Sequence, residues 1–176
     1  MTEDYFKTAV LHHKTGNWNK AKEIYEYILK SKPNDYLVLQ NYALLLSQLG
    51  ENKQAKNIFE KCLKIKPNDY LLLYNYGKFF HNQKIFDKAI EFYEKSFAIQ
   101  PNNNLSMYNI GNIHSEKKEY NKSIIYYEKT INTTPSNFLA HNNMGFSYKY
   151  LGNFEKEEFF FKKSIEKNPN FVEAHV

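Results

Sequence analysis

Apolar side chains recur along the chain at intervals of three and four residues, separated by polar positions. Two examples are Leu37, Asn41, Leu44 and Leu45, and Ile58, Phe59, Cys62 and Leu63. This spacing is the period of amphipathic α-helices, in which one face is apolar and the other is polar. The pattern therefore predicts an all-α fold.

Prolines divide the helical pattern at a constant interval of 34 residues. They are Pro33, Pro67, Pro101, Pro135 and Pro169. A fixed period of this size indicates a stacked array of repeats. The repeats are residues 2–35, 36–69, 70–103, 104–137 and 138–171. Below, a position number counts from the first residue of a repeat.

Each repeat is predicted to contain two helices. The first follows an Asn or Asp pair after the proline, such as Asn34 and Asp35, whose side chains can accept hydrogen bonds from the first free amides. It ends near Gly16, Gly50 or Gly152, or at Lys84 and Lys118 in the middle repeats. The second runs up to the proline, which cannot continue a helix. It starts at about Trp18, Asn52, Phe86, Tyr120 and Phe154. The sequence thus predicts ten antiparallel helices joined by short turns.

Four positions of the repeat hold the same kind of residue from one repeat to the next. Position 8 is small (Ala9, Ala43, Gly77, Gly111, Gly145), position 20 is small in four repeats (Ala21, Ala55, Ala89, Ser123), position 24 is aromatic (Tyr25, Phe59, Tyr93, Tyr127, Phe161), and position 32 is proline. In these positions the sequence resembles the tetratricopeptide repeat family. The resemblance covers residues 2–171 and implies a right-handed superhelical solenoid of five helix-turn-helix units. Glu157 departs from the small residue at position 20, which leaves the packing of the last helix pair least defined.

The chain stops inside what matches a sixth repeat. Residues 172–176 continue the pattern in which Phe171, Ala174 and His175 correspond to Asn137, Ala140 and His141 one period earlier. An end repeat exposes the surface that its neighbour would cover. Either the chain is a fragment of a longer protein, which is the preferred interpretation, or its end is covered by another copy.

Composition excludes several classes of protein. With 42% hydrophobic and 17% aromatic residues, the bulk of the chain is not disordered. Residues 1–10 contain no apolar signal-peptide core, and residues 36–50, the most apolar stretch, are interrupted by polar side chains. The one cysteine, Cys62, cannot form an internal disulfide. We therefore expect a cytoplasmic, reduced protein that does not bind membranes.

The charge distribution argues against nucleic-acid binding. The net charge is +5, and each of the five repeats carries a net charge of +1 or +2. A nucleic-acid site needs a concentrated basic patch. All 24 basic residues are lysine, so arginine is not available for bidentate phosphate or base contacts.

Motifs for catalysis are absent from the sequence. The glycines occupy repeat positions and form no phosphate-binding loop, and neither HExxH nor Cys-x-x-Cys spacing occurs. Cys62 occupies position 27, a buried position in the family, where a reactive thiol is not expected. The histidines, including His141, are assigned to packing or to the surface. The sequence predicts no catalytic residue, no metal site and no cofactor.

A second periodic set points to binding. Position 6 is asparagine in four repeats, and we call Asn41, Asn75, Asn109 and Asn143 the asparagine ladder. The resemblance implies that the first helices line a concave groove, toward which positions 2, 5, 6, 9, 12 and 13 face. An asparagine amide can donate to and accept from a peptide backbone. The predicted groove further contains Leu71, Leu105, Tyr74, Tyr108, Lys78, Asn112, Phe146 and Asn142. The alternative is that ladder asparagines bond only to a neighbouring helix or to water.

We therefore predict a non-catalytic scaffold that binds a peptide or an extended partner segment in the groove. Two alternatives stay open. The ladder resembles the repeat arm of O-linked N-acetylglucosaminyltransferases, so the chain could be the substrate-recognition arm of a larger protein O-glycosyltransferase. The exposed terminal helices could instead make it a homo-oligomer that assembles through its ends.

Overall fold

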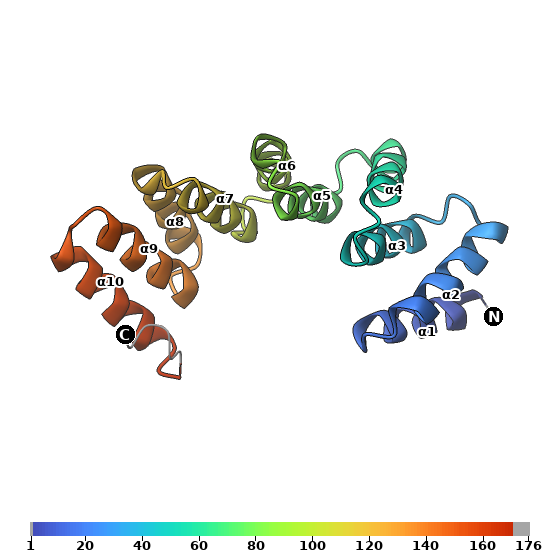
Figure 1. Ribbon diagram of the computed structural model, residues 1–176, viewed down its shortest axis with the longest axis horizontal. Helices are drawn as coiled ribbons and strands as arrows, with labels where there is room; N and C mark the ends of the chain where they lie inside the picture. The colour runs from blue at the N-terminus through green and yellow to red at the C-terminus, as the bar shows by residue number, and fades with distance from the viewer. Residues whose placement is uncertain (1, 171–176) are drawn as a thin grey trace. The chain divides into compact units, whose positions relative to one another are not determined.

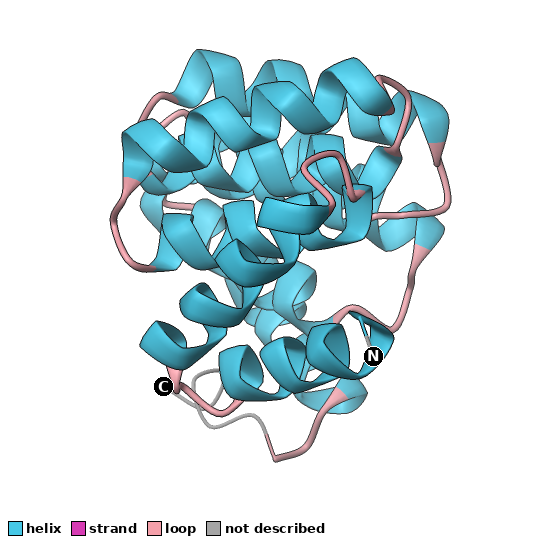
Figure 2. Ribbon diagram, turned by 90° about the vertical axis from the view of Figure 1, so that its right-hand side faces the viewer, coloured by secondary structure: helices cyan, strands magenta, loops and turns pink. Residues whose placement is uncertain are grey.

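The computed structural model describes residues 2–170, which form ten α-helices and no β-strand (Figures 1 and 2). The helices are α1 (Thr2–Lys14), α2 (Trp18–Ser31), α3 (Tyr36–Gln48), α4 (Asn52–Ile65), α5 (Tyr70–Asn82), α6 (Phe86–Ile99), α7 (Leu105–Glu116), α8 (Tyr120–Thr133), α9 (Phe138–Tyr150) and α10 (Phe154–Lys167). The predicted all-α fold is confirmed. The expected sixth repeat at residues 172–176 lies outside the described residues.

The chain divides into two compact units, Met1–Tyr76 and Gly77–Val176, with the boundary inside α5. The first unit holds α1 to α4 and the second holds α6 to α10. Within each unit, the first and second helices of a repeat pack as an antiparallel pair joined by a short turn (Figure 1). The second helix of every repeat begins at the residue that the sequence predicts.

The starts of α3 and α5 use the second residue of the predicted capping pair, whereas the N-cap of α7 is Asn104, which follows the predicted pair and makes no side-chain capping hydrogen bond. The Asp35 carboxylate accepts a hydrogen bond from the Val38 amide at 3.3 Å. The Asp69 carboxylate accepts from the Leu72 amide at 3.1 Å and also from the Tyr36 hydroxyl at 2.8 Å. Asp69 therefore fixes the start of α5 and ties it to α3 of the preceding repeat.

The turns between paired helices contain residues with positive φ. Gly16, Gly50 and Gly152 adopt φ values of 72° to 80°, and Lys84 and Lys118 adopt φ 60° at the same position of the middle repeats. A lysine in this conformation costs roughly 1–2 kcal/mol more than glycine. The predicted ends of the first helices are thus confirmed, including the two at which no glycine is present.

The core of each repeat is an aromatic ring at position 24 packed against the small residue at position 8. Tyr25, Phe59, Tyr93 and Tyr127 are at most 1% exposed. A Cβ atom placed on Gly111 would lie 2.6 Å from Cε1 of Tyr127, and one on Gly145 would lie 2.6 Å from Cε1 of Phe161. The ring therefore occupies the space that a larger residue at position 8 would fill.

Glu157 replaces the small residue at position 20 of the last repeat without preventing α10 from packing on α9. Its carboxylate lies 3.7 Å from the Lys149 ammonium, at the edge of the helix pair. The neighbouring position-24 ring, Phe161, is 9% exposed, more than its counterparts. The last pair is thus formed, with a slightly more open core.

The contact between positions 8 and 24 predicts the effect of Gly111→Ala. Alanine favours a helix by about 1 kcal/mol over glycine, but overpacking against Tyr127 costs about 1–3 kcal/mol. We expect a lower melting temperature by circular dichroism. Asn57→Ala, at an exposed position of α4, is the control and should change stability by less than about 0.5 kcal/mol. A Gly111→Ala protein as stable as the native one would contradict this packing.

Candidate functional site

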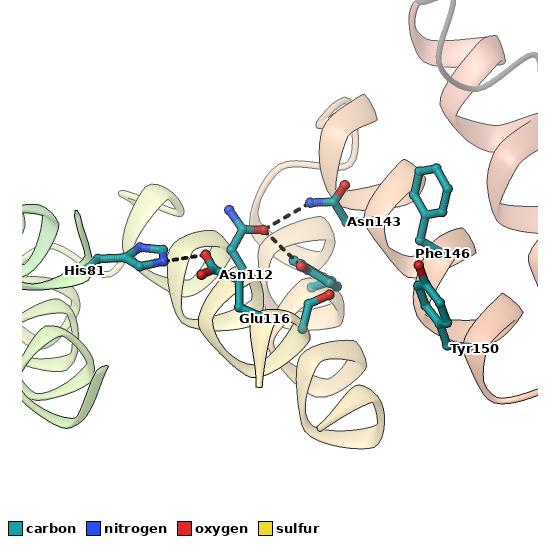
Figure 3. Close-up of a pocket in the computed structure, with 8 residues that line it drawn as sticks. His81, Asn112, Glu116, Asn143, Phe146 and Tyr150 are labelled. Carbon is teal, nitrogen blue, oxygen red and sulfur yellow. Dashed lines mark hydrogen bonds and ion pairs between the residues drawn. The ribbon is translucent and has the colours of Figure 1, made fainter. Parts of the chain in front are cut away.

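The second unit contains a pocket of about 380 Å³ between the first helices of its repeats (Figure 3). Its lining comes from α5, α7, α8 and α9. The lining residues are His81, Asn112, Ser115, Glu116, Tyr127, Asn143, Phe146 and Tyr150. Polar groups of α5 and α7 thus face aromatic side chains of α9.

Hydrogen bonds fix the orientation of the Asn112 amide in this pocket. The Asn143 Nδ2 group donates to Asn112 Oδ1 at 3.0 Å and to the Tyr108 hydroxyl at 3.1 Å. The Tyr127 hydroxyl donates to the same Asn112 Oδ1 at 2.9 Å (Figure 3). With Asn112 Oδ1 accepting both hydrogen bonds, the Asn112 NH₂ group lies on the other side of the amide. No hydrogen bond joins that group to the described residues, and it can donate to a ligand.

The Tyr127 hydroxyl is a permanent donor in this network. The side chain is 1% exposed, and burial raises the pKa of its phenol above the ordinary value of 10.0. The hydroxyl therefore keeps its proton at neutral pH. A buried group of the helix core thus sets the direction in which a half-buried amide donates.

Glu116 forms the charged end of the pocket. Its carboxylate is bonded to His81 Nε2 at 2.8 Å and to the Lys84 ammonium (Figure 3). Burial raises the pKa of this carboxyl, but the hydrogen bonds from Lys84 and His81 lower it by more, so the net pKa is below the ordinary 4.5. Glu116 is therefore ionised at neutral pH and joins α5 to α7.

The opposite wall of the pocket is aromatic. Phe146 and Tyr150 lie one turn apart on α9 (Figure 3). Phe146 packs edge-on against Phe161 at 5.1 Å, and Tyr150, which is 66% exposed, stacks on Tyr120 at 4.8 Å. These contacts hold the rings in place and provide rigid apolar surface.

The ladder asparagines do not share one hydrogen-bonding role. The Asn41 and Asn109 Nδ2 groups donate to the backbone carbonyls one turn earlier, at Leu37 (2.8 Å) and Leu105 (2.9 Å). Asn143 instead donates to Tyr108 and Asn112 of the preceding repeat. Side chains bonded to their own helix are less available to a ligand.

The other predicted groove residues lie on first helices. In the second unit, Tyr108, Asn112 and Asn143 come together in the network above, and Leu105 and Lys78 are exposed. In the first unit, Leu71 is exposed, and Tyr74 and Asn75 are half-buried on α5.

The prediction that Asn142 faces the groove is wrong. This residue was expected to face the groove at position 5 but is 2% exposed. Position 5 lies between the buried and the exposed face of the helix, so the length of the side chain decides its exposure. The longer Tyr74 and Tyr108 are half-buried, whereas the short asparagine is covered.

The ionic pair of the pocket was missed in the sequence, although a spacing signal exists. His81 and Glu116 are 35 residues apart, which places position 12 of one repeat beside position 13 of the next. His13 Nε2 and Gln48 Oε1 have the same spacing and lie 2.8 Å apart. A search for complementary side chains at this spacing would have found both pairs.

Neither an exposed thiol nor a metal-binding cluster is present among the described residues. Cys62 is fully buried, and burial raises the pKa of its thiol to about 12. Within residues 2–170, no three His, Cys, Asp or Glu side chains are placed to bind a metal ion. Nor does any helix in that range have the length and apolar character required to span a membrane.

The Glu116 contacts predict a pH-dependent contribution to stability. Glu116→Gln removes a carboxylate that binds fewer protons in the folded chain than in the unfolded chain. The extra stability that the Glu116 carboxylate gives the native protein should therefore be fully present above pH 4.5. It should be lost as the pH falls through the lower pKa that Glu116 has in the folded chain. At about pH 7 we expect a loss below about 1 kcal/mol, because the group is partly exposed.

Urea unfolding at several pH values measures this difference. Glu128→Gln, at an exposed position of α8, is the matched control and should show no such pH dependence. If the loss of stability caused by Glu116→Gln grew as the solution was acidified, the pairing of Glu116 with His81 and Lys84 would be contradicted.

Several solved structures share this fold. MamA from Desulfovibrio magneticus RS-1 is 20% identical, with a TM-score of 0.83 over 97% of this chain and 96% of that one. PilW, a type IV pilus biogenesis factor, is 19% identical, with a TM-score of 0.81 over 94% and 77%. YrrB, a repeat protein with an unusual peptide-binding site, is 19% identical, with a TM-score of 0.74 over 97% and 88%. At this identity the likeness shows the fold alone.

Sequence comparison identifies the repeats. No curated protein matches the sequence. One family description, tetratricopeptide repeat, matches residues 36–69, 70–103, 106–137 and 139–171. A second model of the same repeat matches residues 5–35. Since these matches span most of the chain, the protein belongs to the tetratricopeptide repeat family.

Proposed function

We propose that the protein binds an extended segment of a partner protein along the first helices of its repeats, without catalysing a reaction. The observation that carries the proposal is the Asn112 amide, held by two hydrogen bonds to its oxygen with its NH₂ group unbonded among the described residues. Backbone carbonyls are the acceptors that every peptide offers. A donor of fixed direction beside an aromatic wall therefore suits a peptide.

The binding mode follows from the two walls of the pocket. Asn112 would donate to a carbonyl of the segment, and Phe146 and Tyr150 would contact one of its apolar side chains. Because Asn143 and Tyr127 already hold the Asn112 amide, little side-chain entropy is lost on binding. YrrB, which shares the fold, is described as having a peptide-binding site, and this supports the same class of ligand here.

The direct test substitutes Asn112 and measures peptide affinity. A library of random peptides about ten residues long supplies a ligand, and calorimetry gives its dissociation constant. Asn112→Ala should weaken binding by about threefold to tenfold, the value of one hydrogen bond. Asn112→Asp keeps the oxygen but removes the donor, so it should weaken binding at least as much.

Asn121→Ala, an exposed asparagine of α8, serves as the control and should bind like the native protein. Thermal melts must show that the variants stay folded. If Asn112→Asp bound the selected peptides as well as the native protein, the donor role of Asn112 would be excluded.

A further inference from the structure

The first unit contains two adjoining pockets that are both lined by Trp18, the one tryptophan of the chain. Their volumes are about 430 Å³ and 420 Å³. The first is lined by Val10, His13, Lys14, Gly16, Trp18, Asn41 and Gln48, and the second by His12, Gly16, Asn17, Trp18, Asn19 and Lys20. Trp18 and Gly16 belong to both linings, so the two pockets adjoin at these residues.

The charge of this surface is positive. Lys14 and Lys20 line one pocket each, and no carboxylate among the described residues lines either. Both lysines are exposed, and neither forms an ion pair with a residue that the structure describes. In contrast, Lys22 on the same helix as Lys20 is paired with Glu51 at 2.6 Å. The positive charge beside Trp18 is thus not neutralised within the described chain.

The equivalent pocket of the second unit shows that this charge is particular to the first repeat. Lys14 and Glu116 both occupy position 13, so the two pockets carry opposite charges at the same place. Glu116 is neutralised by Lys84, whereas Lys14 has no such neighbour among the described residues. The two pockets therefore differ in the ligand charge that they favour.

Trp18 itself is available for contact. The side chain is 41% exposed, and no ring stacking or cation contact joins it to the residues described. Phe86, at the same position of the third repeat, is covered by the His81 ring at 6.0 Å and by the Lys84 ammonium at 5.7 Å. An exposed indole that lines two pockets is typical of the anchor residues of binding sites.

We infer that the surface around Trp18 binds an acidic segment of a partner protein. Carboxylates of the segment pair with Lys14 and Lys20, and an intervening apolar side chain or the peptide backbone packs on the indole. A nucleic acid fits less well, because the surface has only two lysines and no arginine for phosphate. An acidic membrane fits less well, because binding it takes a larger apolar face or a cluster of basic residues.

Trp18 reports on its own binding site, because it is the one tryptophan of the chain. The probe is a capped peptide of about eight residues in which glutamate alternates with leucine and glycine. The control peptide has glutamine in place of glutamate. The glutamate peptide should change the Trp18 emission in a saturable way, and the glutamine peptide should bind at least about fivefold more weakly. Raising the salt from about 0.05 M to about 0.5 M should weaken the glutamate peptide further.

Two pairs of lysine substitutions separate the effect of the charge beside Trp18 from the effect of the net charge of the protein. Lys14→Gln with Lys20→Gln should weaken the glutamate peptide by about fivefold or more. Lys30→Gln with Lys64→Gln removes the same charge at exposed positions near the ends of α2 and α4, and should leave the affinity within about twofold. Asn112→Ala should not alter this titration. A negative result at Trp18 can therefore be told apart from a negative result for peptide binding at the Asn112 pocket of the second unit.

Equal binding of the two peptides, or equal loss with the two lysine pairs, would overturn the inference. A single-stranded oligonucleotide or anionic lipid vesicles that bound more tightly than the peptide, in a manner dependent on Lys14 and Lys20, would overturn the choice of an acidic polypeptide. Trp18→Ala, measured by calorimetry, should weaken the glutamate peptide while the melting curve stays close to that of the native protein.

Discussion

The structure of every repeat depends on one packing constraint, the aromatic ring at position 24 against the small residue at position 8. Gly77, Gly111 and Gly145 meet their partner rings so closely that a Cβ atom would lie within 2.8 Å of ring carbon. The pair fixes how near the two helices of a repeat approach. That distance in turn determines which side chains of the first helix face solvent, and so determines what can form a site.

In the fourth repeat, the aromatic residue at position 24 also forms a hydrogen bond to the first helix. Its ring, Tyr127, carries a hydroxyl that reaches position 9, where Asn112 accepts the hydrogen bond. Position 9 holds no amide in the other repeats, and Phe59 and Phe161 have no hydroxyl at position 24. A core residue and a surface residue are therefore coupled in one repeat. The other repeats provide the scaffold on which that coupling is held.

The 34-residue period was sufficient to predict the helices, since caps, turns and core residues are set within each repeat. It gave the starts of α2, α4, α6, α8 and α10 and the small residue at position 8. It did not give the bonds of individual asparagines: Asn41 bonds to its own helix and Asn143 to the preceding repeat. Those choices depend on which side chains the neighbouring repeat presents, as for His81 and Glu116.

The coupling between core and surface is tested most directly by Tyr127→Phe, followed by measurement of affinity for a peptide selected on the native protein. The substitution keeps the ring against Gly111 and removes only the hydroxyl of a side chain that is 1% exposed. Affinity should fall by about threefold, with a stability loss near 1 kcal/mol, because the Asn112 amide is no longer held in one direction. An unchanged affinity in a folded Tyr127→Phe protein would contradict the account.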